Sequence, residues 1–133
     1  MSNKKRISAR EVMKDDFIVM DGLVTVKEGI SILLEKNADL LFIDKRNEND
    51  EYGIVVLPDI AQKIIAPNKS PERVNLYEIM TKPVVGIDPD MDVRYVAKLF
   101  YRFGLSVGPV VENKTIIGVI SYKELVLHGL LEE

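Results

Sequence analysis

The residue types in this sequence that could bind a charged ligand gather at one predicted helix start. Ser121 and Glu124 stand three positions apart, with Lys123 between them. Lys123 could add positive charge for a phosphate beside the helix N-terminus, which itself favours anions. The same Ser-x-x-Glu spacing is also a capping box, in which the two side chains satisfy backbone N–H groups without any ligand. From these residues alone, both interpretations stay open.

Side chains suited to catalysis or metal binding are scarce. The chain has one histidine, His128, and no cysteine, which excludes disulfides, thiolate metal sites and a cysteine nucleophile. Ser121 has no histidine base near it in the sequence. The alternating acids Asp88, Asp90 and Asp92 lack the glycine and glutamate that complete a calcium loop, so turn and cap roles are expected. We therefore expect neither an enzyme nor a metal site.

The composition is that of an ordinary globular protein. The 133 residues are 47% hydrophobic and 29% charged, with a formal net charge of −3, so no general attraction to nucleic acid or to anionic lipid is expected. The charged N-terminus does not read as a signal peptide, and apolar runs such as Leu40–Ile43 are too short to cross a membrane. These features predict a cytoplasmic protein with no membrane partner.

The sequence contains an internal repeat. A shift of 67 positions places Arg10–Met13 over Tyr77–Met80. Further along, a shift of 65 places Gly53–Val55 over Gly118–Ile120, because the first half has the longer polar turn between its last two strands. Few identities are strict, but both halves show the same order of predicted elements. We infer a duplication.

Each half is predicted to contain a short helical segment that ends at a methionine, a strand, a helix, two strands and a closing helix. In the first half these elements are expected at Ser8–Met13, Phe17–Met20, 26–36, Leu40–Ile43, Gly53–Leu57 and 58–65. In the second half they are expected at Leu76–Met80, Val84–Ile87, 93–103, Val107–Val111, Ile116–Ile120 and 122–131. Thr25 and Asp92 are the expected N-caps of the two longer helices. The predicted repeats are 7–66 and 76–131, with a linker at 67–75.

Strands this short and apolar need helices over them, and one unit of this size buries too little surface to be stable alone. We therefore expect an α+β fold of two β-α-β-β-α repeats, related by pseudo-twofold symmetry and packed sheet to sheet. The predicted helix 93–103 has a second apolar side, formed by Leu99, Tyr101 and Phe103. This side predicts a homodimer through these helices; alternatively, Phe103 closes the core of its own chain.

The order of motifs resembles that of a known family. The second half carries Met80–Val84, Gly108–Val111 and Gly118–Glu124, and the first half carries the looser Val12–Met13, Phe42–Ile43 and Gly53–Asp59. This order resembles the cystathionine-β-synthase (CBS) domain, which occurs in tandem pairs. The resemblance covers residues 7–131. It implies a regulatory module that binds an adenine nucleotide or a related adenosyl ligand between the two repeats and acts on another domain or protein.

The resemblance also implies roles for individual residues. Glu124 would hold the ribose, while Ser121 and the helix N-terminus would face the phosphate, with Lys123 beside them. The slot for the base would be lined by Thr81, Lys82, Pro83, Val84, Gly108 and Pro109. A second and weaker site would use Phe17, Ile18 and Asp59, because Val56 replaces the expected hydroxyl.

Two functions follow from this interpretation of the sequence. The first is a sensor, with no obligate cofactor, that binds AMP, ATP or S-adenosylmethionine and signals to an effector protein. The second is a ligand-free dimerisation or adaptor module of the same fold, in which the altered motifs have lost the site. Glu124 in place of aspartate and Val56 in place of a hydroxyl favour the second function. Thr81, Pro83, Pro109 and Ser121 favour the first.

Overall fold

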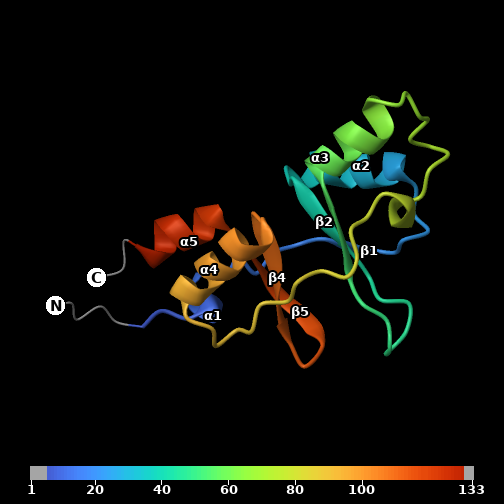
Figure 1. The fold of residues 1–133 in the computed structure, drawn as a ribbon. Coiled ribbons are helices and arrows are strands. Elements are labelled where there is room, and N and C mark those ends of the chain that lie inside the picture. Colours follow the sequence, from blue (N-terminus) through green and yellow to red (C-terminus); the bar gives the residue numbers. More distant parts are fainter. Residues whose placement is uncertain (1–5, 131–133) are drawn as a thin grey trace. The chain divides into compact units, whose positions relative to one another are not determined.

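The computed structural model describes residues 6–130, and the chain forms two compact units (Figure 1). The terminal unit consists of Met1–Phe17 and Val85–Glu133, and the central unit consists of Ile18–Val84. Each unit combines helices with a small sheet, so the predicted α+β class is confirmed. The packing of one sheet on the other stays a prediction.

The central unit contains a three-stranded sheet in the order β1-β2-β3. Its elements are β1 (Val19–Met20), α2 (Val26–Lys36), β2 (Leu40–Ile43), β3 (Gly53–Val56), α3 (Leu57–Ile60), the π-helical turn η1 (Ala61–Ile65) and the 3₁₀ turn η2 (Leu76–Glu78). β1 is parallel to β2, and β2 is antiparallel to β3. The helices cover one face of this sheet, where Leu41 and Val55 form a core with Val26, Leu33 and Ile60.

The described part of the terminal unit contains the hairpin of β4 and β5 and three helices. Its elements are α1 (Ala9–Val12), α4 (Val93–Phe103), β4 (Val107–Glu112), β5 (Thr115–Ser121) and α5 (Tyr122–Gly129). α4 and α5 lie beside the hairpin in Figure 1. The core joins all of these elements, and its members include Val12, Phe100, Val110, Ile120 and Leu125.

The two longer helices have the predicted bounds because both of their ends carry stop signals. Thr25 Oγ1 accepts a hydrogen bond from Glu28 N at 3.2 Å, and Asp92 Oδ1 accepts one from Arg94 N at 2.8 Å. At the other ends, Asn37 (φ 52°) and Gly104 (φ 65°) adopt the left-handed conformation that ends a helix. The predicted N-caps are confirmed.

The predicted strand at Val84–Ile87 is wrong. Only Ile87 joins the sheet: its N–H donates to Pro109 O at 2.8 Å, and its carbonyl accepts from Val111 N at 2.9 Å. Val85 and Gly86 are exposed, so this segment has little apolar surface to bury as a strand. The predicted helix 58–65 also divides into α3 and the π-helical turn.

The segment that precedes each repeat's first strand packs on the hairpin of the other repeat. We call residues 8–14 and 75–81 the lead segments. Lys14 exchanges two backbone hydrogen bonds with Val119 of β5, both at 2.9 Å, within the terminal unit. Thr81 exchanges two with Ile54 of β3, at 2.9 and 3.0 Å, within the central unit. Each lead segment therefore pairs with the hairpin of the other repeat. The predicted sequence boundaries of the repeats stay a prediction.

These contacts are related by the two sequence shifts. Residues 14 and 81 differ by the shift of 67, and their partners Val119 and Ile54 differ by the shift of 65. The same pattern holds where each lead segment begins, since Ser8 pairs with Asp92 and Asn75 pairs with Thr25. The duplication inferred from the sequence therefore has a structural counterpart.

Each lead segment also places a methionine over a glycine of the paired strand. A Cβ atom added at Gly118 would collide with the Met13 side chain, and one added at Gly53 would collide with Met80. A side chain at either position would therefore push the lead segment away from the hairpin. These two glycines permit the close approach on which the pairing depends.

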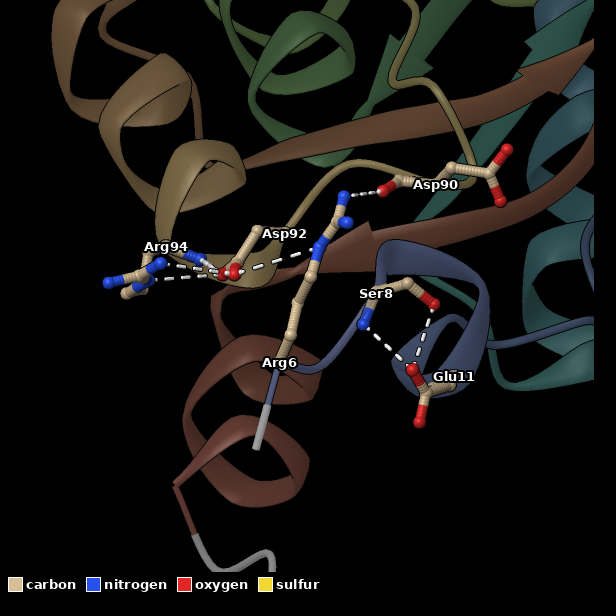
Figure 2. Close-up of polar contacts among 6 residues, drawn as sticks. All are labelled: Arg6, Ser8, Glu11, Asp90, Asp92 and Arg94. Carbon is tan, nitrogen blue, oxygen red and sulfur yellow. Dashed lines mark hydrogen bonds and ion pairs between the residues drawn. The ribbon is translucent and has the colours of Figure 1, made fainter. Parts of the chain in front are cut away.

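Buried Asp92 joins Arg6, which precedes the first lead segment, to the start of α4 (Figure 2). Its carboxylate lies 3.3 Å from Arg94 Nη2 and 4.0 Å from Arg6 Nε, and Arg6 Nη2 donates to Asp90 O at 2.7 Å. The pKa of Asp92 is lowered, mainly because the backbone N–H of Arg94 donates to it and further because the Arg94 guanidinium lies beside it. Asp92 is therefore charged in the folded protein at neutral pH.

Replacement of Asp92 by alanine is expected to lower the free energy of unfolding at pH 7 by about 1–2 kcal/mol, since a cap is lost. The charge of Asp92 stabilises the fold above its unfolded pKa of about 3.9, and this contribution is lost as the pH falls through the lowered native pKa. The difference between wild type and Asp92→Ala should therefore shrink between pH 5 and pH 2.5 in urea titrations. Thr25→Ala, the matched uncharged cap, should show a nearly constant difference. An Asp92→Ala difference that does not change with pH would contradict this account.

Replacement of Gly118 by alanine is expected to lower the free energy of unfolding by about 1–3 kcal/mol, because the new methyl group meets Met13 and the carbonyl of Lys14. Gly129→Ala serves as the control in the same unit. The nearest atom to its new Cβ is 3.6 Å away, so this variant should keep or slightly raise stability. Equal stabilities of the two variants in urea unfolding would be incompatible with the close packing of Met13 on Gly118.

Candidate functional site

The predicted ligand residues of the second repeat meet where β5 ends and α5 begins. Ser121 N and Ser121 Oγ both donate to Glu124 Oε1, each at 2.7 Å. Lys123 N donates in turn to Ser121 Oγ at 3.2 Å. The capping box considered from the sequence is therefore present, and it holds the half-buried Ser121 and Glu124 against each other.

The capping box leaves polar groups at this site unused. Glu124 Oε2 has no hydrogen-bond partner among residues 6–130, and the exposed Lys123 ammonium has no ion pair among them. A carboxylate oxygen can accept hydrogen bonds from hydroxyl groups, and an ammonium beside a helix N-terminus attracts anions. The start of α5 therefore offers an acceptor and a cation to a ligand without giving up its cap.

The equivalent position of the first repeat is more fully satisfied. Asp59 Oδ2 accepts from Val56 N at 2.9 Å, and Asp59 Oδ1 lies 3.7 Å from Lys63 Nζ. Lys63 Nζ also donates to Ile79 O at 2.9 Å, so it is held in place. Both carboxylate oxygens of Asp59 are therefore engaged, and Val56 supplies no hydroxyl.

Lys82, one of the predicted slot residues, forms a close ion pair in the central unit. Its Nζ lies 2.6 Å from Asp50 Oδ1. Asp50 also accepts from Arg46 N at 2.8 Å and from Arg46 Nε at 2.9 Å. These hydrogen bonds, first from the Arg46 side chain and then from Lys82, hold the pKa of Asp50 well below its usual range. The Lys82 ammonium is therefore held by a charged carboxylate from the turn between β2 and β3.

Asp50 was missed by the sequence analysis. It lies in a polar turn with several other charged residues, and only its side chain's burial and the approach of Lys82 distinguish it. No spacing or motif in the sequence signals that contact.

The structure distributes the predicted site residues between the two units. Thr81, Lys82, Pro83, Val84, Ile18 and Asp59 belong to the central unit. Phe17, Gly108, Pro109, Ser121, Lys123 and Glu124 belong to the terminal unit. Within the terminal unit, Ser121, Lys123 and Glu124 lie together, while Gly108 and Pro109 are buried in β4. The assignment of all these residues to ligand binding stays a prediction.

Three further features bear on the type of site. In the described part of the chain, no three histidine, aspartate or glutamate side chains gather closely enough to hold a metal ion. The acids Asp88 and Asp92 have the turn and cap roles expected for them, since Asp88 Oδ1 accepts from Asp90 N at 2.8 Å. No helix within residues 6–130 is long and apolar enough to cross a bilayer.

Several solved structures share this fold. The hexameric CBS-CP12 protein from bloom-forming cyanobacteria is 34% identical, with a TM-score of 0.87, over 92% of this chain and 71% of that chain. The CBS domain pair of protein MJ0100, solved in complex with 5′-methylthioadenosine and S-adenosyl-L-methionine, is 26% identical, with a TM-score of 0.79, over 94% of this chain and 98% of that chain.

Curated relatives that match the chain are longer than it is. An uncharacterized protein of Methanopyrus kandleri is 28% identical over 123 residues, which make up 91% of this chain and 62% of the relative. A homoserine O-acetyltransferase of Methanococcus vannielii is 29% identical over 115 residues, which make up 86% of this chain and 23% of the relative. The chain thus spans less than two thirds of the length of these relatives.

The family follows from these comparisons taken with the repeated fold. A family model of the CBS domain matches residues 76–130, which contain the second hairpin and the α5 capping box. The first repeat carries the same backbone contacts at the shifts described above. The CBS-CP12 protein resembles both repeats, because the similarity covers 92% of this chain. The chain therefore belongs to the CBS domain family, as a tandem CBS domain pair.

Proposed function

We propose that this CBS pair is a regulatory module that binds an adenosyl ligand at the start of α5 and signals to a partner. The observation that carries the proposal is the second carboxylate oxygen of Glu124, which has no partner within the described residues and lies beside a helix N-terminus. The complex of the MJ0100 CBS pair with two adenosyl compounds supports this class of ligand. AMP, ATP and S-adenosylmethionine are the candidate ligands.

The chemistry of the site fits a nucleoside. The two ribose hydroxyls are donors, and Glu124 Oε2 is an acceptor that the cap does not use. Lys123 and the α5 N-terminus favour a negatively charged group, which AMP and ATP carry as phosphate. Thr81, Lys82, Pro83, Val84, Gly108 and Pro109 are proposed to contribute to the base slot.

The first repeat is proposed to hold the weaker site. Asp59 would have to release Lys63 before its Oδ1 could accept from a ribose hydroxyl, because that ion pair occupies Oδ1. Phe17 and Ile18 would be the apolar part of this site. The two repeats thus differ in their acids: both carboxylate oxygens of Asp59 have partners, whereas only one oxygen of Glu124 has a partner among the described residues.

We also propose that the module is not catalytic. The match to homoserine O-acetyltransferase spans only 23% of that enzyme, which supports a regulatory segment beside a separate catalytic part. By analogy, the effector of this chain is another domain or another protein. A cytoplasmic location is part of the same proposal.

A homodimer is proposed to form through exposed apolar side chains at the end of α4 and along α5. Phe103 is 58% exposed and therefore does not close the core, whereas Leu99 packs against the core. α5 exposes Val126 and Leu127, and the exposed Leu130 follows its C-terminal end. The CBS-CP12 protein is hexameric, which supports oligomer formation in this family.

A ligand-free adaptor is the second candidate function. It is favoured by one observation: Ser121 and Glu124 satisfy each other through the capping box, so the local structure needs no ligand. A titration separates the two candidates.

Calorimetric titration with AMP, ATP and S-adenosylmethionine is expected to show saturable binding of at least one of them. Glu124→Gln should weaken that binding by about 10- to 100-fold, because a charged acceptor is lost. Glutamine still supports a capping box, so the melting temperature without ligand should stay close to that of wild type. Glu124→Gln therefore separates ligand binding from folding.

Asp59→Asn is the matched control in the first repeat and should leave the tighter binding step unchanged. Wild-type affinity in Glu124→Gln would contradict the assignment of the site while leaving the function intact. The absence of heat and of any thermal shift with all three compounds at millimolar concentration would contradict the sensor function and favour the adaptor.

A further inference from the structure

The outward face of α4 is basic. Arg94, Lys98 and Arg102 stand four residues apart, so they follow one side of the helix, and all three are exposed. The helix contains no acidic residue. Tyr95 and Tyr101, which are 55% and 88% exposed, lie on the same side. We call these five residues the α4 basic face.

Two of the three cations of the α4 basic face are not neutralised by an acid among the described residues. Within residues 6–130, neither Lys98 nor Arg102 forms an ion pair, and Arg94 shares the N-cap Asp92 at 3.3 Å (Figure 2). Arg94 and Lys98 instead both approach the ring of Tyr95, at 5.9 and 5.1 Å from its centroid. One aromatic ring therefore stabilises two like charges.

This arrangement lowers the stability of the isolated helix. Like charges four residues apart repel each other, and the face contains two such pairs. The chain as a whole carries a net charge of −3, whereas α4 carries three positive charges and no negative one. A binding partner with negative charge would remove the repulsion.

The spacing of the three cations favours one kind of anionic partner, a helix with regularly spaced acids. Four residues of an α-helix span about 6 Å, so a second helix with glutamates at the same interval can face all three cations in register. The exposed tyrosine rings offer apolar contact beside them. A nucleic acid would find only three cations on an acidic protein, and a membrane would find two tyrosines but no large aliphatic group on this face. A second copy of the chain that packed the same basic face against this one would bring like charges together.

We propose that the α4 basic face docks an acidic amphipathic helix of a partner protein. This proposal deepens the proposed function by naming the chemistry of the effector, and it depends on that function only for the existence of a partner. The docking face and the α5 capping box use different residues, so the two can be tested separately.

The test uses a synthetic 21-residue helical peptide with glutamates at every fourth position and leucines beside them. A peptide of the same composition with glutamates around the whole helix is the comparison. Fluorescence anisotropy in low salt should show that the patterned peptide binds more tightly. Lys98→Glu should weaken its binding at least tenfold, whereas Lys36→Glu, the same charge reversal on α2, should leave it unchanged.

A thermal unfolding measurement separates this role from a structural one. Lys98→Glu places an acid between two arginines, so its melting temperature should rise by about 2–5 °C rather than fall. Binding of adenosyl ligands should be unchanged in this variant, so failure of the ligand titration would not mimic failure of the docking test.

Three outcomes would overturn the proposal: equal binding of the two peptides, unchanged peptide binding by Lys98→Glu, or a lower melting temperature of that variant. A 20-nucleotide RNA or a phosphatidylserine vesicle that binds through Lys98 more tightly than the patterned peptide would also overturn it, in favour of that other anion.

Discussion

The backbone pairing of each lead segment with the hairpin of the other repeat is the constraint on which the fold depends. Lys14 lies beside Val119 on one edge of the second hairpin, and Thr81 lies beside Ile54 on the same edge of the first. On the opposite edges, the hairpins pair with Ile87 and with β1. A hairpin of two strands is barely stable in water by itself. Each two-stranded hairpin therefore gains a paired backbone segment on both of its edges, and one of these two segments comes from the other repeat.

Because of this exchange, the chain passes from one unit to the other at two places, and several candidate ligand residues lie there. The chain passes between the two units at residues 17–18 and 84–85. Phe17 and Ile18 stand at the first passage, and Thr81–Val84 leads into the second. A ligand at either of the two proposed sites would therefore act on one of the segments that connect the units. The Asp50–Lys82 ion pair shows that one of these segments is already tied to the β2–β3 turn of the central unit.

Part of the fold could be predicted from the sequence, because the residues that determine it are close together in the chain. The bounds of α2 and α4 follow from cap residues and left-handed ends that lie within the helices' own sequence. The exchange of lead segments could not be predicted, since a sequence period shows which residues are equivalent but not which copy they contact. The role of Asp50 could not be predicted either, because its contact with Lys82 is distant in the sequence and no motif indicates it. At the α5 start, the sequence predicts both the cap and the ligand residues. Only the geometry shows that Glu124 Oε2 has no hydrogen-bond partner among residues 6–130.

The exchanged pairing is tested most directly by native-state hydrogen exchange, measured by NMR for the amides of Lys14, Val119, Ile54 and Thr81. Each of these amides donates to its partner's carbonyl. We expect the Lys14 amide to be as protected as that of Val119, and the Thr81 amide to be as protected as that of Ile54. The two amides of each pair should lose protection together as urea is added. Lys14 and Thr81 amides that exchange at the rate of an unfolded chain, while Val119 and Ile54 stay protected, would contradict the exchanged pairing.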